Sequence, residues 1–140
     1  PPLEGEDGPL SLGLAGVASD HAGAWYVSTK DSQLHVSPAG RVRRVAALPA
    51  ALLPANSIAA SPDGSAVFVA DYSNKIRRVE VPTGEVATLA GSGEDGDADG
   101  VGDAAEFDGP FGVALSSDAS ALFVADHYNH KIRRVEVATG

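Results

Sequence analysis

Acidic residues are concentrated in one stretch of the chain, at a spacing that could bind a divalent cation. The pattern D-x-D-x-D-G-x5-E of a calcium loop is met from Asp95 to Glu106, with Asp103 at its ninth position. No helical pattern flanks this loop, however, and Gly102 stands where an apolar residue normally anchors it. We therefore predict no metal site, and calcium binding stays an open alternative. The acidic residues from Gly91 to Asp108 are Glu94, Asp95, Asp97, Asp99, Asp103, Glu106 and Asp108.

Two other aspartates, Asp71 and Asp126, each begin a turn after an apolar run. A side chain at such a position can accept hydrogen bonds from the backbone N–H groups of the turn. Ligand contact on one face of the molecule is the alternative role. Because both aspartates recur with the same flanking sequence, we favour the structural role.

Arginine pairs recur in the same way. Adjacent residues of a strand point to opposite faces, so each pair sends one guanidinium to each side and forms no continuous basic patch. We predict salt bridges between neighbouring structural units in preference to an anion-binding or nucleic-acid-binding role. The pairs are Arg43-Arg44, Arg77-Arg78 and Arg133-Arg134.

Histidines and serines offer no recognisable catalytic arrangement. No histidine pair has the spacing of zinc ligands on a helix, and only His127 and His130 lie close together, within a turn. No serine stands in a G-x-S-x-G elbow. We therefore predict no catalytic, cofactor-binding or metal-binding residue and no cofactor. The remaining histidines are His21 and His35.

These residues belong to an internal repeat. The stretch VFVADYSNKIRRVEVPTG, Val67 to Gly84, returns as LFVADHYNHKIRRVEVATG, Leu122 to Gly140. The offset between copies is 55 residues at Asp71 and 56 residues at Ile76, so the second of these copies has one extra residue in its turn. Repetition at this period is typical of solenoids, propellers and other arrays. A more divergent copy precedes them, from about Gly16 to Val45.

Each repeat predicts four short strands separated by turns. Ser61-Pro62-Asp63-Gly64 suits a type I turn, because proline presets φ at the second position and Gly64 tolerates the exit conformation. The segment Val67 to Ala70 is apolar on both of its alternating faces. We therefore expect it to be buried on two sides, as in a sheet covered by neighbours on both faces.

Composition excludes several classes of protein. The 140 residues are 44% hydrophobic and include no cysteine, so a disulfide framework and a thiolate site are absent. The net charge of −9 comes mainly from the acidic loop, which disfavours binding to a phosphate backbone. The longest apolar stretch, Val45 to Ala55, contains two prolines and is shorter than the roughly 20 residues of a membrane span. We predict neither nucleic-acid nor membrane partners, and the compartment stays unknown.

The repeats resemble those of the NHL-repeat β-propeller family. The strings VADHYNHKIRRVEVATG, EVATLAGSG and GPFGVA carry the resemblance. The family consensus of an Asp, an Asn-His pair, a basic residue and an Ile is matched in the last repeat, whereas the middle repeat lacks the His. The first repeat departs further, with Thr29 in the place of the Asp. The matching residues of the last repeat are Asp126, Asn129, His130, Lys131, Ile132 and Arg133.

The resemblance implies an all-β propeller of NHL type, with about three four-stranded blades of an incomplete ring. We expect a linker or trimmed terminus at 1–11, a degenerate first repeat at 12–50, a second at 51–110 that includes the acidic inter-blade loop 91–108, and a third at 111–140 that stops before its last strand. A ring of about 4–8 blades would need further blades, which we expect from a longer chain. Oligomerisation of a short protomer is the alternative.

The family implies a scaffold that presents a face or a central channel to its ligands. We therefore predict a binding module of a larger protein that mediates protein–protein interaction. The alternative is an enzyme like the lactonase-type or lyase-type propellers, with a metal in the central channel and active-site residues outside these repeats. RNA binding, which some relatives perform through a basic face, is disfavoured by the acidic charge.

Overall fold

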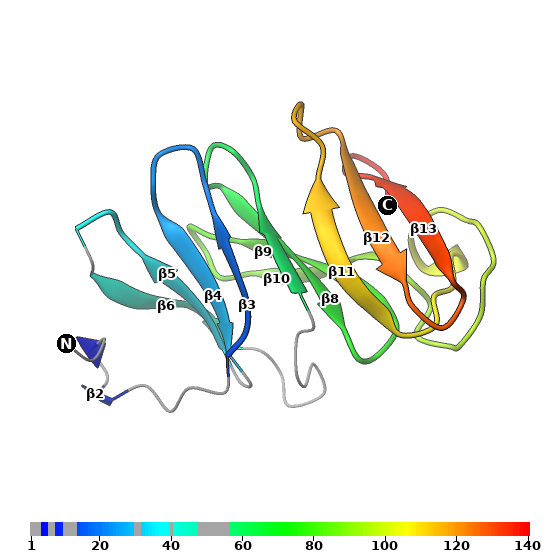
Figure 1. Cartoon of the computed structure of the whole chain (residues 1–140), viewed down its shortest axis with the longest axis horizontal. Coiled ribbons are helices and arrows are strands. Elements are labelled where there is room, and N and C mark those ends of the chain that lie inside the picture. Colours follow the sequence, from blue (N-terminus) through cyan, green and yellow to red (C-terminus); the bar gives the residue numbers. More distant parts are fainter. Residues whose placement is uncertain (1–3, 6–7, 10–13, 30–31, 40, 48–56) are drawn as a thin grey trace.

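The computed structural model of the chain describes residues 4–5, 8–9, 14–29, 32–39, 41–47 and 57–140. They form three β-sheets that stand side by side (Figure 1). The only helical element in these ranges is a short 3-10 turn, Gly102–Ala104. No helix of the described ranges is long and apolar enough to cross a membrane. The prediction of an all-β fold built from sheet-forming repeats is confirmed.

The first sheet has the divergent repeat as its centre. Its four main strands pair antiparallel in chain order, and two short strands extend the sheet beyond β6, where Gly5 pairs with Val42 in parallel. The main strands are β3 (Leu14–Ser19), β4 (Trp25–Thr29), β5 (Ser32–Val36) and β6 (Val42–Ala47), and the added strands are β1 (Glu4–Gly5) and β2 (Gly8–Pro9).

The second and third sheets are the two close copies of the repeat. Both are antiparallel, and each strand pairs with the next in the sequence, as consecutive strands of one blade do. The second sheet contains β7 (Ser57–Ala60), β8 (Ala66–Asp71), β9 (Lys75–Glu80) and β10 (Val86–Ala90). The third sheet contains β11 (Pro110–Leu115), β12 (Ala121–Asp126) and β13 (Lys131–Glu136).

The first strands of the three sheets lie next to one another. Strand β7 contacts β3 on one side and β11 on the other. A Cβ atom at Gly16 would stand 3.0 Å from Ile58 Cγ2, so a glycine permits the close approach of β3 to β7. On the other side, the backbone N–H of Val113 donates to Ser57 Oγ at 3.3 Å. The sheets therefore meet along their first strands, as propeller blades meet around their axis.

Apolar side chains fill the spaces between the sheets. Every residue of β8 is buried. Val67 and Val69 pack in the core shared with the first sheet, which also includes Tyr26. Phe68 and Ala70 point to the opposite side and join the core shared with the third sheet. This alternation confirms the expectation that β8 is buried on two sides. The core toward the third sheet also contains Phe107, Leu122, Val124 and Val135.

The turn between the first two strands of a blade is fixed by one aspartate and two serines. The N–H of Gly64 donates to the carbonyl of Ser61 at 2.9 Å, which closes the predicted turn. Asp63 Oδ1 accepts hydrogen bonds from the hydroxyl of Ser61 and from both the N–H and the hydroxyl of Ser65. The third sheet repeats this pattern, with Asp118 accepting from Ser116 and Ser120. The third sheet therefore builds the same turn without its proline or glycine.

The turn between the second and third strands shows where the extra residue of the last repeat is inserted. Asp71 pairs with Lys75 in the second sheet, and Asp126 pairs with Lys131 in the third. The residue just before the third strand has a positive φ of 55° in both, and it is Asn74 in one sheet and His130 in the other. By backbone position, Asn74 therefore corresponds to His130, and the extra residue of the third sheet is one of His127, Tyr128 and Asn129.

Candidate functional site

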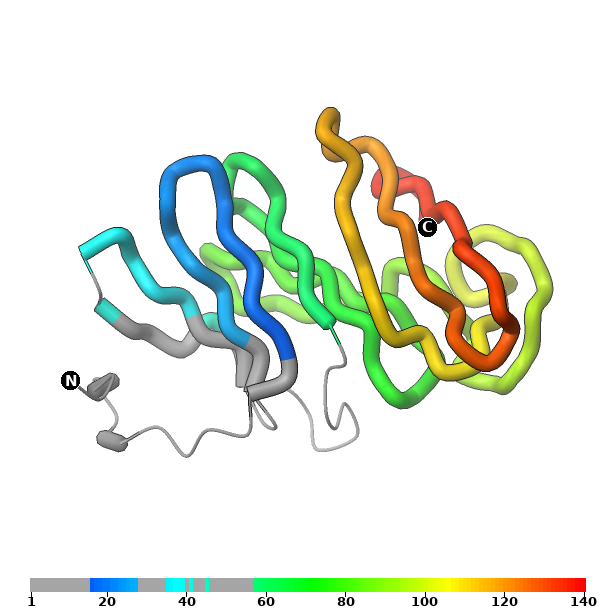
Figure 2. The backbone as a smooth tube through the Cα atoms, in the orientation of Figure 1, coloured from blue at the N-terminus to red at the C-terminus, as the bar shows by residue number. Residues whose placement is uncertain are grey.

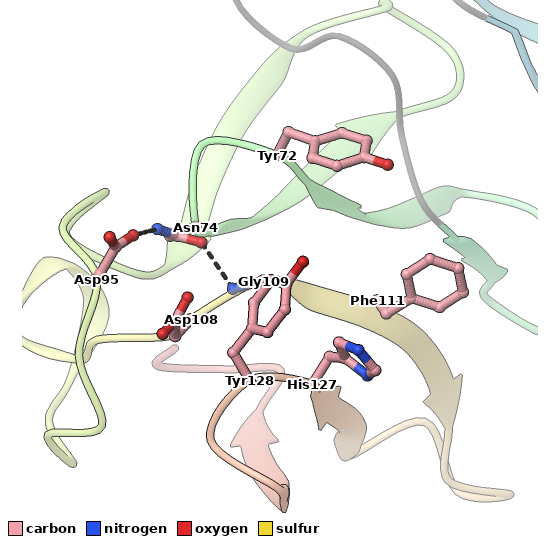
Figure 3. Close-up of a pocket in the computed structure, with 8 residues that line it drawn as sticks. All are labelled: Tyr72, Asn74, Asp95, Asp108, Gly109, Phe111, His127 and Tyr128. Carbon is pink, nitrogen blue, oxygen red and sulfur yellow. Dashed lines mark hydrogen bonds between the residues drawn. The ribbon is translucent and has the colours of Figure 1, made fainter.

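A shallow depression of about 470 Å³ lies between the second and third sheets (Figure 3). Its walls come from the turns after β8 and β12, from the acidic loop and from the start of β11 with the segment before it. These pieces are far apart in the sequence but meet because the two sheets stand side by side. The described residues that line the depression are Tyr72, Asn74, Asp95, Asp108, Gly109, Phe111, His127 and Tyr128.

Asn74 holds the floor of the depression together. Its φ of 55° turns the chain sharply before β9, a conformation that asparagine tolerates better than most residues. The side-chain amide then donates to Asp95 Oδ1 at 2.5 Å and accepts from the N–H of Gly109 at 2.9 Å (Figure 3). Because Asn74 is only 8% exposed, these bonds are shielded from water and fix the loop against the turn.

Gly109 allows Tyr128 to lie against the backbone. It has a φ of +60°, and a Cβ atom built there would stand 2.5 Å from Tyr128 Cδ2. The turn is also tied to this segment, since the N–H of Tyr128 donates to the carbonyl of Asp108 at 3.0 Å. The position of the tyrosine ring in the depression therefore depends on the absence of a side chain at residue 109.

Three aromatic side chains of the depression are largely exposed. Tyr72, Phe111 and Tyr128 have relative exposures of 57%, 57% and 66%. The ring of His127 lies between two of them, with its centroid 6.2 Å from Phe111 and 4.9 Å from Tyr128. Exposed aromatic rings gathered in one hollow are unusual on a surface without a partner and are enriched in interfaces.

The carboxylates of the calcium-loop pattern are not gathered around one point. Asp97 Oδ2 binds Lys131 Nζ at 2.5 Å, and Asp99 Oδ1 binds Arg133 Nη2 at 2.6 Å. Asp95 instead points to Asn74. Within the described ranges no group of three or more His, Cys, Asp or Glu side chains is placed to hold a metal ion. The ion pairs of Lys131 and Arg133 hold the acidic loop against β13. The loop lies beside β13 in Figure 2.

The charge of Lys131 also changes the acidity of its partner. A hydrogen bond and the positive charge of Lys131 hold the pKa of Asp97 below its ordinary value of 3.8. Both side chains are about half exposed, so the energy of this pair in water is small. The pair therefore orients the loop and contributes little to stability.

Asp71 accepts hydrogen bonds from the backbone of its own turn, as predicted, whereas Asp126 accepts from the segment before β11 and from the side chain of Asn129. Both are fully buried. Asp71 Oδ1 accepts from the N–H of Ser73 at 2.8 Å, and its Oδ2 accepts from Arg77 Nε at 2.7 Å. Asp126 Oδ1 accepts from the N–H of Asp108 at 2.8 Å, and its Oδ2 binds Arg133 Nη1 at 3.1 Å. The second aspartate therefore also fixes the segment that enters the depression.

The prediction of salt bridges between blades was wrong for three of the four paired arginines whose side chains the structure describes. Arg77 binds Asp71 of its own sheet, Arg78 binds Glu80 two residues away, and Arg134 binds Glu136 in the same manner. Arg133 does reach beyond its sheet, to the acidic loop that connects the blades. Each of these arginines pairs with an acid of its own sheet and not with one of the neighbouring blade, because strand pairing holds the nearer acid in place. The side chains of Arg43-Arg44 lie outside the described residues.

His127 and His130 lie in different surroundings. His127 stacks in the aromatic group, whereas His130 is an exposed residue at the positive-φ position of its turn. Of the residues around the depression, sequence reasoning missed Tyr72, Phe111 and Tyr128. A usable signal was present in the sequence, because the same turn of two successive repeats, just after the Asp, contains a tyrosine.

The chain is similar in sequence to curated NHL-repeat proteins. No protein-family model matches the chain. NHL repeat-containing protein 2 of Homo sapiens is 40% identical over 91 residues, 59% of this chain, and the Gallus gallus protein of that name is 35% identical over 88 residues. Protein SUPPRESSOR OF QUENCHING 1, chloroplastic, of Arabidopsis thaliana is 36% identical over 78 residues, 56% of this chain. The chain spans 12%, 12% and 7% of the length of these relatives.

Solved structures share the arrangement of the sheets. An auxiliary nutrient binding protein of Bacteroides ovatus matches 89% of this chain with a TM-score of 0.69 and 19% identity, and the chain covers 34% of it. A chain of the Mitotic Checkpoint Complex matches 89% with a TM-score of 0.64 and 15% identity, and the chain covers 33% of it. Identities this low bear on the fold alone. Sequence and fold agree that the chain carries NHL repeats and that its three sheets are blades of an NHL-type β-propeller.

Proposed function

We propose that this chain is a binding module that recognises a protein partner through the depression between its second and third blades. The observation that carries the proposal is the exposure of Tyr72, Phe111 and Tyr128 in one hollow. Tyrosine and other aromatic residues are the side chains that most often dominate the energy of protein interfaces. A scaffold with these rings on its surface is equipped to bind another protein.

The framework of the depression supports this role. Asn74 and Gly109 fix the two turns and the entering segment by hydrogen bonds and a tight contact, so the rings are presented on fixed backbone. A preorganised surface loses less conformational entropy when it binds, because its side chains and loops are already ordered. Phosphate-rich ligands are disfavoured, because Asp95 and Asp108 are the charged residues of the described lining.

The fold is compatible with assembly into larger complexes. One structural neighbour is a chain of the Mitotic Checkpoint Complex, and others are nutrient binding proteins. These proteins resemble this chain in fold alone. The activity of the whole NHL-repeat relatives is not assigned to this chain, because the chain spans 12% of their length.

Site-specific photocrosslinking tests the proposal. A benzophenone amino acid would replace Tyr72 or Tyr128 in the protein expressed in its native host, and a control would carry it at Ala87, an exposed position of β10 away from the depression. We expect a discrete protein adduct from Tyr72 and Tyr128 that is absent from Ala87. Equal labelling at all three positions, or adducts to nucleic acid alone, would contradict the proposal.

A further inference from the structure

The lining of the depression combines rings with negative charge. Tyr72, Phe111 and Tyr128 surround an open space in Figure 3, and the carboxylates of Asp95 and Asp108 stand at one side of it. No Lys or Arg is among the described lining residues. The faces of aromatic rings attract cations, and carboxylates bind them by charge-assisted hydrogen bonds. Both kinds of group favour the same class of ligand.

Neither carboxylate of the depression has a cationic partner among the described residues. Asp97, Asp99, Asp71 and Asp126 are all paired with Lys131, Arg133 or Arg77. By contrast, Asp95 contacts only the neutral amide of Asn74, and the carboxylate of Asp108 makes no hydrogen bond or ion pair within the described ranges. Negative charge at the depression is therefore available to a ligand.

We propose that the depression receives an arginine side chain from an extended segment of the protein partner. A planar guanidinium can stack on an aromatic face and at the same time offer N–H donors to a carboxylate, which an ammonium does less well. The acidic net charge of −9 would attract a basic segment from a distance. This inference rests on the proposed function, because it names the part of the partner that the depression selects.

A matched pair of peptides tests the charge requirement directly. The probes are a short Gly/Ser peptide with one central arginine and the same peptide with citrulline, which keeps the shape but not the charge. Binding would be followed by NMR shifts of the Tyr72 and Tyr128 rings. We expect saturable shifts with arginine and weaker ones with citrulline. Equal binding of both peptides would overturn the inference, as would tighter binding of a glutamate peptide.

Variants assign the binding energy to particular side chains. We expect Asp95→Asn and Asp108→Asn each to weaken the arginine peptide about two- to fivefold, as for exposed ion pairs. Tyr72→Leu should weaken it by a similar factor, about two- to fivefold, as for exposed cation–π contacts. The matched controls are Asp103→Asn and Trp25→Leu, which change exposed residues outside the depression and should leave binding unchanged. Equal losses in the controls would overturn the inference.

The peptide and crosslinking results can fail independently. Crosslinks from Tyr72 to a partner segment without arginine, together with charge-independent peptide binding, would retain the proposed function and overturn this inference. Arginine-selective peptide binding without any protein adduct in cells would support the chemistry of the depression and count against the proposed function. The NMR spectrum of each variant would confirm that its fold is unchanged.

Discussion

At the scale of single residues, a few backbone conformations decide what the side chains can do. Positive φ angles occur at Asn74, Ala119 and His130 among the described non-glycine residues, and at eight described glycines, which include Gly64, Gly102 and Gly109. The left-handed region costs an L-residue roughly 1–2 kcal/mol unless the residue is glycine, with a smaller cost for asparagine. These positions therefore provide stringent tests of the structure.

Gly109→Ala should destabilise the protein by more than the cost of its φ alone. The φ term is about 1–2 kcal/mol, and the new Cβ would also displace Tyr128. The control is Gly102→Ala, which has the same φ of +60° but no atom within 4 Å of the added Cβ. Urea unfolding measures both.

The added cost at Gly109 should disappear when the clash is removed. In a Tyr128→Ala background, Gly109→Ala is expected to cost the same as Gly102→Ala. If the two glycine variants are equally unstable with Tyr128 present, the ring does not lie where the structure places it.

Ala119→Gly should stabilise the protein by about 1 kcal/mol, because it removes the left-handed strain of an alanine at φ 58°. The corresponding position of the second blade already carries Gly64. Thermal and urea unfolding test the change, with Ala104→Gly as the control at an exposed position without positive φ. A loss of stability in Ala119→Gly equal to that of the control would contradict the argument.

At the scale of elements, each turn or loop is held by one or two polar side chains. Asp63 and Asp118 organise equivalent turns, and Asn74 connects one turn to the acidic loop. At the other end of β8 and β12, Asp71 accepts from the N–H of Ser73, and Asp126 accepts from the side-chain amide of Asn129. Strand pairing fixes the distances between these turns, so a repeat of the sequence repeats the hydrogen bonds.

Hydrogen bonds from Ser61 and Ser65 lower the pKa of Asp63 from 3.8 to about 2, with Ser61 the largest cause. A lowered pKa means that this group's contribution to stability is present above pH 3.8 and is lost as the pH falls through about 2. Ser61→Ala should raise the pKa of Asp63 toward 3.8. NMR titration of the carboxyl carbon measures it.

The equivalent turn provides the control for this titration. Asp118 also has a pKa lowered to about 2, with the hydroxyl of Ser116 as the largest cause. Ser61→Ala should therefore leave Asp118 unchanged, and Ser116→Ala should move Asp118 alone. A shift of both carboxyl groups in either variant would show that the effect is not local.

The sequence predicted the elements better than the site. Strand positions followed from the repeat, two-sided burial of β8 from its apolar alternation, and the role of Asp71 from turn chemistry. The meeting of Tyr72 with Phe111 and Tyr128 was not predictable in this way, because it depends on how two sheets are placed. The partners of Arg77 and Arg78 were also missed, since each arginine has several acids within reach in sequence and only strand register selects one.

At the scale of the whole molecule, Arg133 connects more parts than any other side chain in the described ranges. It binds buried Asp126, exposed Asp99 and the carbonyls of Ala98 and Glu106, and its guanidinium lies 5.1 Å from the ring centre of Phe107. It therefore joins the third blade to the loop that comes from the second.

Arg133→Ala should cost about 3–5 kcal/mol, because it leaves the buried charge of Asp126 without its cation. Guanidinium unfolding gives the change, and hydrogen exchange should show faster opening of the loop 91–108. Arg134→Ala is the control, since its pair with Glu136 is about half exposed and should be worth less than about 1 kcal/mol. Similar losses for both variants would contradict the central role of Arg133.

The depression lies across the boundary between two blades, and this has a mechanical consequence. Tyr72 and Asn74 belong to the second blade, whereas Phe111, His127 and Tyr128 belong to the third. An occupant that touches both sides must be released, or must stretch, before the blades can separate. A bound ligand would therefore stabilise the contact between the two blades. The force needed to pull the blades apart would then increase with the occupancy of the depression.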